Sequence, residues 1–230
     1  DTNRSTFNMG LSRIDIRDDR SRRLAQGYEW LSFGLQLPDA DTAGNWSIKV
    51  NALLNASRTF NDFGMAELVL WTRYFAAQIT LSELGDYNAA LLISDEITAD
   101  PAIRRYAEMS LAVMKLRLHA LLFERRAGEL AARPGSADPF QSTAVETAAL
   151  ATRLGNLFER AETLYLAGVD LAERGQEQEA LSRFDEALNL AMSIEADDLA
   201  TRVREDMVAI HGARGDVAAS SRVLQAIESQ

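Results

Sequence analysis

The sequence predicts an all-α protein built from helical hairpins stacked side by side, and three observations support this class. Only four prolines and thirteen glycines occur in 230 residues, which suits long helices. Apolar residues recur with a helical period from about residue 21 onward. Short glycine-containing turns separate the amphipathic segments, as they do in antiparallel helix pairs. One hairpin cannot bury both of its apolar faces, so neighbouring hairpins are expected to stack.

The chain is expected to fall into four parts. Residues 1–20 show no sustained period and are predicted to form an extended or frayed arm, with a helix as the alternative. Residues 21–132 are expected to form an N-terminal set of helical repeats and residues 142–230 a C-terminal set. The loop predicted between them, at 133–141, contains RPGSADPF, which is rich in turn-forming residues.

Four helices are predicted in the N-terminal set after a polar, turn-rich link at residues 35–45. Breaks are expected near Gly64 and at Gly85-Asp86-Tyr87. A further helix ends before Asp100-Pro101, because proline cannot continue a helix but can begin the next. The predicted helices cover 46–61, 65–84, 88–98 and 103–132, and the last segment fits one long helix or two.

The clearest hairpin lies in the C-terminal set, after a helix predicted at residues 142–153. Its first helix, within 161–174, has small or apolar residues at i, i+3, i+4 and i+7, while Asp170 lies elsewhere. The apolar pattern restarts after Gly175. A second hairpin is predicted at 201–214 and 217–228, around Gly215-Asp216. Residues of the clearest apolar face are Leu164, Ala167, Gly168 and Leu171.

Residues 161–193 resemble a tetratricopeptide repeat, a 34-residue helix-turn-helix unit. The resemblance is carried by large and small residues at the signature positions of such a unit, although Met192 stands where proline is common. Weaker units can be aligned at about 71–101 and 201–228. The signature residues are Leu164, Ala167, Gly168, Leu171, Ala180, Phe184 and Ala187.

This resemblance implies a tetratricopeptide-like α-α solenoid whose hairpins stack as a right-handed superhelix. The interval from Gly175 to Gly215 exceeds one standard unit, so the second helix and the following turn are longer than usual. Degenerate members are therefore expected beside the strong one. Exposed apolar ends of such a solenoid leave an end-to-end homodimer open.

The resemblance also implies a binding groove on the concave surface lined by the first helix of each unit. Related chaperone-tail binders clamp a terminal carboxylate with asparagine and lysine at these positions, and this unit has neither. Its two glutamates would repel such a carboxylate, so a partner segment of basic or apolar character is expected. The groove residues of the strong unit are Glu162, Tyr165, Val169, Ala172 and Glu173.

Composition argues against several other partners. The net charge is -10, and the most basic cluster, RDDRSRR at residues 17–23, is interrupted by two aspartates, so no nucleic-acid partner is expected. No run approaches the roughly 18 apolar residues of a membrane span, so membrane insertion is not expected within this segment.

The arginine-rich, lysine-poor composition indicates a GC-rich bacterial genome. A chain beginning at Asp1 is expected to be processed or excised, in cytoplasm or periplasm.

No catalytic, cofactor or metal site is predicted. The chain has no cysteine, no glycine-rich phosphate loop and no nucleophile elbow. His119 and His211 lack partners at metal-ligand spacing and are expected at the core edge or surface. Core packing is expected for the aromatic group Trp71, Tyr74 and Phe75 rather than a ligand cage. Solvent exposure is expected for the acidic residues Glu177, Glu179, Asp185 and Glu186.

These observations predict a non-enzymatic scaffold or protein-protein interaction module. The alternative is a sensory or regulatory segment of a larger bacterial signalling protein with an output domain elsewhere. A helical enzyme or small-ligand receptor is a third interpretation, which would require an apolar cavity lined by converging polar groups.

Overall fold

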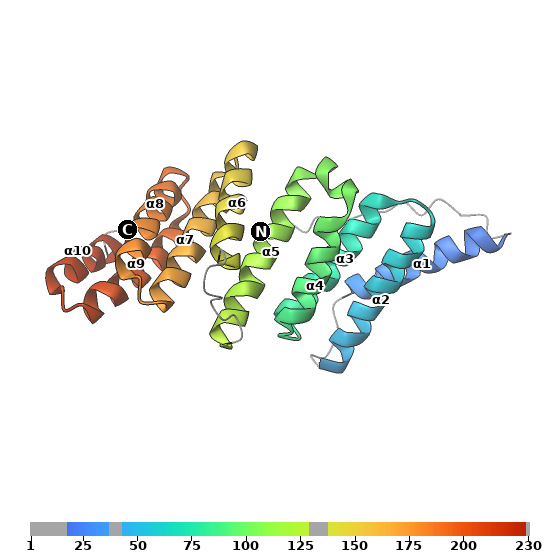
Figure 1. Cartoon of the computed structure of the whole chain (residues 1–230), viewed down its shortest axis with the longest axis horizontal. Helices are drawn as coiled ribbons and strands as arrows, with labels where there is room; N and C mark the ends of the chain where they lie inside the picture. The colour runs from blue at the N-terminus through green and yellow to red at the C-terminus, as the bar shows by residue number, and fades with distance from the viewer. Residues whose placement is uncertain (1–17, 37–42, 129–137, 229–230) are drawn as a thin grey trace. The chain divides into compact units, whose positions relative to one another are not determined.

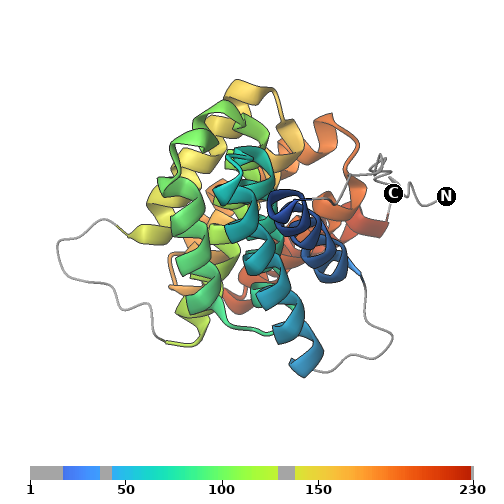
Figure 2. The ribbon, with the colours of Figure 1, turned by 90° about the vertical axis from the view of Figure 1, so that its right-hand side faces the viewer.

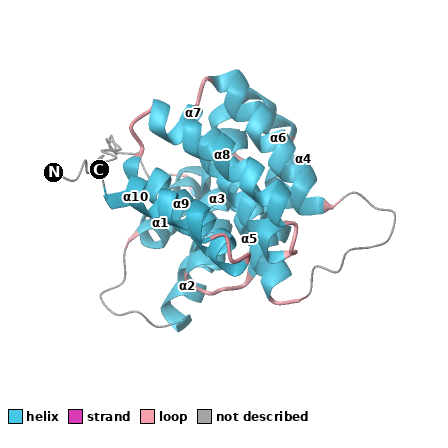
Figure 3. Ribbon diagram, turned by 90° about the vertical axis from the view of Figure 1, so that its left-hand side faces the viewer, coloured by secondary structure: helices cyan, strands magenta, loops and turns pink. Residues whose placement is uncertain are grey.

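The computed structural model describes residues 18–36, 43–128 and 138–228. Within these ranges the chain forms ten α-helices and one short 3-10 helix and contains no strand (Figure 3). Consecutive helices pack against each other within the compact parts of the chain, so the predicted all-α class of stacked helices is confirmed. None of the described helices combines the length and apolar character that a membrane span requires.

The chain divides into two compact units, Asp1–Leu84 and Gly85–Gln230. This division lies at the predicted turn before Tyr87, whereas the sequence placed its boundary at the loop 133–141. Most of that loop, and residues 1–17 of the predicted arm, lie outside the described residues.

The described residues of the first unit form three helices, and each packs against the next. They are α1 (Asp19–Leu35), α2 (Ala43–Asp62) and α3 (Ala66–Ser82). Figure 2 shows α1 and α2 in blue, lying against each other. The Asp18 carboxylate accepts a hydrogen bond from the backbone N–H of Ser21 at 2.6 Å, which caps α1. The last two residues of the predicted arm are therefore helical.

Close approach of α1 and α2 depends on two glycines of α1. A Cβ at Gly27 would lie 2.8 Å from Thr59 Cγ2, and one at Gly34 would lie 2.5 Å from Leu53 Cγ. Phe60 of α2 is fully buried, and its ring meets that of Tyr28 edge-on at 5.1 Å between centroids. These contacts make α1 and α2 a tightly packed pair.

The second unit contains α4 to α10, which follow one another in chain order from green to red in Figure 1. Successive helices pack together, and α7 additionally contacts both α5 and α9. The odd-numbered helices α5, α7 and α9 thus lie side by side in one layer. The elements are α4 (Tyr87–Ala99), η1 (Pro101–Arg105), α5 (Ala107–Arg126), α6 (Pro139–Leu154), α7 (Leu157–Glu173), α8 (Glu177–Ser193), α9 (Asp197–Ala213) and α10 (Val217–Glu228).

Helix α6 begins earlier than predicted, because residues 139–141 belong to it rather than to the loop. The Asp138 carboxylate accepts hydrogen bonds from the backbone N–H groups of Phe140 and Gln141, and Pro139 occupies the first helical turn. The Asp-Pro pair therefore starts the helix. In the segment predicted at 103–132, the described residues, which end at 128, contain the end of the 3-10 helix η1 and the helix α5.

Turns of the second unit follow a regular period that the sequence only partly revealed. Backbone angles φ are positive at Gly155, Gly175, Glu195 and Gly215, which are evenly spaced along the chain. Helices α7, α8 and α9 are equal in length. A hairpin therefore repeats at the interval that separates Gly175 from Gly215, which is longer than the tetratricopeptide unit to which residues 161–193 were compared.

The core of this unit is centred on α7 and α8. Phe184 is fully buried, and a Cβ at Gly168 would lie 2.5 Å from its ring. Leu164 and Leu171 belong to the same buried cluster. The residues predicted to permit close helix packing do so at this contact.

Candidate functional site

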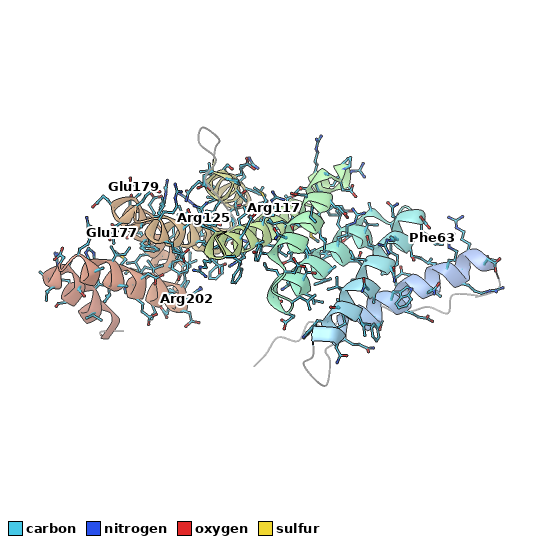
Figure 4. The ribbon with its side chains drawn as sticks, turned by 60° about the horizontal axis from the view of Figure 1, so that its bottom comes forward. Phe63, Arg117, Arg125, Glu177, Glu179 and Arg202 are labelled. Carbon is cyan, nitrogen blue, oxygen red and sulfur yellow. The ribbon has the colours of Figure 1, made fainter. Side chains whose placement is uncertain are left out.

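The candidate site is the face shared by α5, α7 and α9, which we call the inner face. It is defined by Lys115, His119 and Arg126 of α5, the five predicted groove residues and Phe158 of α7, and Arg202 and Asp206 of α9. Contacts of α7 with both neighbours bring these three helices together. Figure 4 shows Arg202 at the lower side of the second unit, whereas Glu177 and Glu179 are drawn at its upper side.

Tyr165 lies at the centre of the inner face and touches two helices besides its own. Its ring centroid is 5.9 Å from that of Phe184 on α8, and the guanidinium of Arg202 lies 5.4 Å above it. A cation over an aromatic face is attracted by the negative face of the ring. Tyr165 is half-buried, so the residue is not fully covered by these neighbours.

The hydroxyl of Tyr165 is held beside a carboxylate. Burial, together with the charge of Asp206 and a hydrogen bond to it, raises the pKa of Tyr165 to about 12, although Arg202 and Arg126 oppose this shift. Tyr165 therefore stays protonated at neutral pH and donates to Asp206. This pairing fixes the ring orientation between α7 and α9.

Glu162 is not a free acid on the inner face. Its side chain is only 14% exposed, and Oε2 lies 2.5 Å from Lys115 Nζ on α5. Glu159 also pairs with this ammonium, at 3.0 Å. Burial by itself lowers the pKa of Lys115, but hydrogen bonds and charges of Glu162 and Glu159 raise it above its usual value. Glu162 is therefore paired with Lys115, which shares its single positive charge with Glu159.

Glu173 is also paired, though it is more accessible than Glu162. Its Oε1 accepts a hydrogen bond from Arg126 Nε at 2.8 Å, and Nη2 of the same arginine lies 2.7 Å away. The side chain of Glu173 is 33% exposed. The two predicted acidic flanks of the groove are thus bound to basic residues of α5, and they hold α5 against α7.

Val169 and Ala172 are partly buried rather than freely displayed. Val169 packs against two clusters of buried residues, and Ala172 packs against the cluster around Phe184. They therefore form the floor of the inner face beside Tyr165. The structure places all five predicted groove residues on this face but gives them unequal access to a partner.

Sequence reasoning missed Phe158, which extends the same stripe of α7. It lies four residues before Glu162 and seven before Tyr165, so it falls on their side of the helix. Its side chain is 42% exposed. The i, i+4, i+7 spacing was a sufficient signal, but the helix was expected to begin after this residue.

His119 of α5 completes the inner face. It is half-buried, and burial lowers its pKa despite the nearby carboxylates of Glu162 and Glu159. The imidazole is therefore neutral at physiological pH. This fits the expectation of a histidine at the core edge.

Behind the inner face lies a buried charge network that the sequence did not predict. Asp170 is fully buried, with Oδ1 2.9 Å from Arg125 Nε and Oδ2 accepting a hydrogen bond from Gln141 at 2.7 Å. Arg125 and Arg174 both pair with Asp138, at 2.7 and 3.0 Å. The network ties α5, α6 and α7 together.

The pKa values of Asp170 and Asp138 are shifted in opposite directions within this network. Burial raises the pKa of Asp170, although Gln141 and Arg125 oppose it. Burial also acts on Asp138, but hydrogen bonds from Arg125 and from backbone N–H groups lower its pKa. The partners of both aspartates come from α5, α6 and α7 or their ends, so the network joins these three helices.

The aromatic group of α3, in the first unit, differs from expectation. Trp71 is 39% exposed, so the prediction of core packing is wrong for this residue. Its ring stacks on that of Phe75 at 5.6 Å and meets Tyr74 edge-on at 6.0 Å. The helical spacing correctly indicated that the three rings lie together on one helix. It could not show which side of α3 is covered by neighbouring helices.

Within the described residues no group of three or more histidines and carboxylates is arranged to hold a metal ion. The acids at 179, 185 and 186 are exposed as predicted, while Glu177 is partly covered by an ion pair with Arg214 at 3.2 Å.

No protein-family model matches this sequence, and no curated protein is similar enough to count as a relative. The tetratricopeptide likeness therefore stays a prediction from the residues of 161–193.

Proposed function

We propose that this protein is a non-enzymatic interaction module whose inner face binds an apolar segment of a partner protein. The observation that supports this most directly is Tyr165, half-exposed at the centre of three helices and fixed by Phe184, Arg202 and Asp206. Phe158 adds a second exposed ring on the same helix face. Aromatic residues held in place beside arginine are typical contact centres of protein interfaces.

The ion pairs around Tyr165 support binding without rearrangement of this surface. Lys115 with Glu162, and Arg126 with Glu173, join α5 to α7 on either side of the aromatic stripe. A face that is already ordered loses little conformational entropy on binding, which favours affinity from a modest contact area. The proposal is thus a preformed surface and not a segment that folds on its partner.

The same ion pairs support a narrower proposal for the chemistry of the partner. Because Glu162 and Glu173 are already paired with basic groups, they offer little charge to a basic peptide. The surface left for a partner is the apolar one formed by Phe158, Tyr165 and Val169. We therefore propose a partner segment with large apolar residues, and a weak dependence of its affinity on salt.

Selection of peptides from a random phage-displayed library tests this proposal. Selected peptides are expected to carry aromatic or aliphatic residues, and Tyr165→Ala should weaken their binding about tenfold or more, as loss of a central aromatic contact does. Phe158→Ala should weaken binding by a smaller factor. Fluorescence anisotropy with labelled peptides measures both effects, and circular dichroism confirms that the variants are folded.

Val145→Ala provides the matched control, since Val145 is 65% exposed on α6 and does not belong to the inner face. Its affinity for the selected peptides should equal that of the parent protein. If the selected peptides bind Tyr165→Ala and Phe158→Ala as tightly as the parent, the inner face is not the binding surface.

A further inference from the structure

The three basic groups of the inner face that carry a full positive charge differ in how that charge is met. Lys115 and Arg126 of α5 each form ion pairs with glutamates of α7. Arg202 of α9 forms no ion pair with a carboxylate of the described residues. Arg202 is exposed, at the lower side of the second unit in Figure 4. Its charge is therefore open to a binding partner.

The acidic residues one turn away along α9 do not pair with Arg202. Asp198 and Asp206 lie four residues before and after it, on the same side of the helix. Asp206 instead accepts the hydrogen bond from the hydroxyl of Tyr165. Asp198 is exposed, and neither carboxylate forms an ion pair with Arg202 in the described part of the chain. The guanidinium thus lacks the bidentate carboxylate partner that it binds best.

The ring of Tyr165 holds this guanidinium in place. The central carbon of the guanidinium lies 5.4 Å from the ring centroid, and the ring itself is fixed by Phe184 and Asp206. A contact between a cation and a ring leaves the fork of N–H donors that matches a carboxylate. Because the guanidinium is already held beside the ring, less side-chain freedom is lost when a carboxylate binds to it.

Comparison of the two hairpins shows that this charge is a departure from the preceding one. Arg202 stands one hairpin interval after Glu162, at the corresponding place on α9. Glu162 meets a basic residue, Lys115, on the helix before it. Arg202 meets the ring of Tyr165 on the helix before it, and no carboxylate. An ion pair closes this position on α7, whereas on α9 the charge is left beside the exposed aromatic stripe.

We propose that the partner segment carries one acidic residue beside the large apolar residue that contacts Tyr165, and that its carboxylate pairs with Arg202. This inference rests on the function proposed for the inner face and specifies the chemistry of the partner further. The net charge of -10 repels a strongly acidic segment, which favours one acid over a run of them. A single exposed ion pair also agrees with a weak dependence of affinity on salt.

Parallel selections from the phage-displayed library, on the parent protein and on Arg202→Met, test this pairing. Methionine keeps an unbranched side chain beside the ring but removes the charge. Peptides selected on the parent should be enriched in aspartate or glutamate next to their aromatic or aliphatic residue. Peptides selected on Arg202→Met should keep the apolar residue and lose the acid. Arg153→Met is the matched control, because Arg153 is exposed on α6 and outside the inner face, and it should select the same peptides as the parent.

A double-mutant cycle measures the pairing directly. One selected peptide with an amidated C-terminus is compared, by fluorescence anisotropy, with a version in which its acid is replaced by the corresponding amide. This replacement should weaken binding to the parent and to Arg153→Met about threefold to fivefold, as loss of an exposed ion pair does. Binding to Arg202→Met should be unchanged by it. Arg202→Gln is a second uncharged variant, and circular dichroism confirms that each variant is folded.

Tyr165→Ala separates the two ways in which the experiment can fail. If this variant binds the selected peptides as tightly as the parent, the inner face is not the binding surface and the proposed function is wrong as well. If it weakens binding, but the parent selects no acid, only the pairing with Arg202 is wrong. The pairing is equally overturned if replacement of the acid weakens binding to the parent, Arg202→Met and Arg202→Gln by the same factor.

Discussion

Gly168 is the residue whose size matters most for the hairpin of α7 and α8. Its hydrogen leaves space for the Phe184 ring, and any Cβ would lie 2.5 Å from a ring carbon, closer than side chains tolerate. Gly212 of α9 is also helical, but a Cβ there would meet no atom within 4 Å. Substituting each of the two glycines therefore distinguishes the effect of helix propensity on stability from the effect of packing.

Gly168→Ala should lower the free energy of unfolding by about 1–2 kcal/mol, since overpacking outweighs the gain in helix propensity. Gly212→Ala should raise it by about 0.5 kcal/mol, because only the propensity changes. Urea unfolding followed by circular dichroism measures both values. Equal effects of the two substitutions would contradict the close contact of Gly168 with Phe184.

The two aspartates of the buried network, Asp170 and Asp138, should affect the pH dependence of stability in opposite directions. The pKa of Asp170 in the folded protein lies above the ordinary value of 3.8, so its contribution to stability falls as the pH rises through the interval above 3.8. The pKa of Asp138 lies below 3.8, so its contribution is present above that value and is lost as the pH falls.

Two asparagine variants reveal this difference when unfolding is measured at about pH 3 to 4 and at about pH 7. The stability advantage of the parent over Asp170→Asn should be larger at the lower pH. Its advantage over Asp138→Asn should be larger at the higher pH, and asparagine still caps α6 in that variant. The same direction of pH dependence for both variants would show that the two carboxylates are not held as described.

At the scale of elements, the turns of the second unit determine the repeat. Gly155, Gly175 and Gly215 adopt positive φ at the ends of their helices, where glycine has no steric cost. Glu195 adopts φ of 57° at the corresponding place between α8 and α9. A residue with a side chain is disfavoured in this conformation, so this turn is strained relative to the other three.

Replacing Glu195 with glycine should therefore stabilise the protein by about 0.5–1 kcal/mol. The reciprocal change, Gly175→Ala, should destabilise it by about 1 kcal/mol, because nothing lies within 4 Å of that Cβ and only the backbone angle is affected. Thermal unfolding of both variants compares them. A loss of stability in Glu195→Gly would mean that the glutamate side chain makes a contribution larger than its backbone strain.

At the scale of the whole molecule, the chain consists of two compact units that divide after Leu84. The second unit has its own buried core, which includes Leu118, Phe140 and Phe184. It also contains the inner face, which is built from α5, α7 and α9. The candidate binding surface is therefore a property of this unit.

A fragment of residues 85–230 should accordingly fold by itself, with a helical circular dichroism spectrum and a cooperative urea transition. Its m value should be smaller than that of the full chain, because less surface is exposed on unfolding. A fragment without a cooperative transition would show that the first unit is required for the second to fold.

Much of the fold could be predicted from the sequence because helices depend on local features. Glycine turns at 85, 175 and 215 and the apolar period between them located most helices of the second unit correctly. The turn at Glu195 carries no glycine, and Gly155 was not recognised as the end of a helix. The helix starts near Leu157 and Asp197 were consequently placed too late.

The candidate site was less predictable, because its charges pair across long separations in the chain. Lys115 and Glu162 are far apart in sequence, and so are Arg126 and Glu173, yet each pair lies within hydrogen-bonding distance. Glu162 and Glu173 lie on the polar side of one amphipathic helix, so the sequence suggested two carboxylates exposed to solvent. Asp170 likewise lay off the apolar face of α7, but α5 and α6 cover it completely.

The sequence by itself determined the all-α class, most hairpin boundaries, and the small residues at which α7 and α8 touch, because each depends on residues close together in the chain. Tertiary structure alone decided which polar side chains of those helices are free. Whether a carboxylate on a helix meets water or an arginine depends on the neighbouring helices, which are distant in sequence.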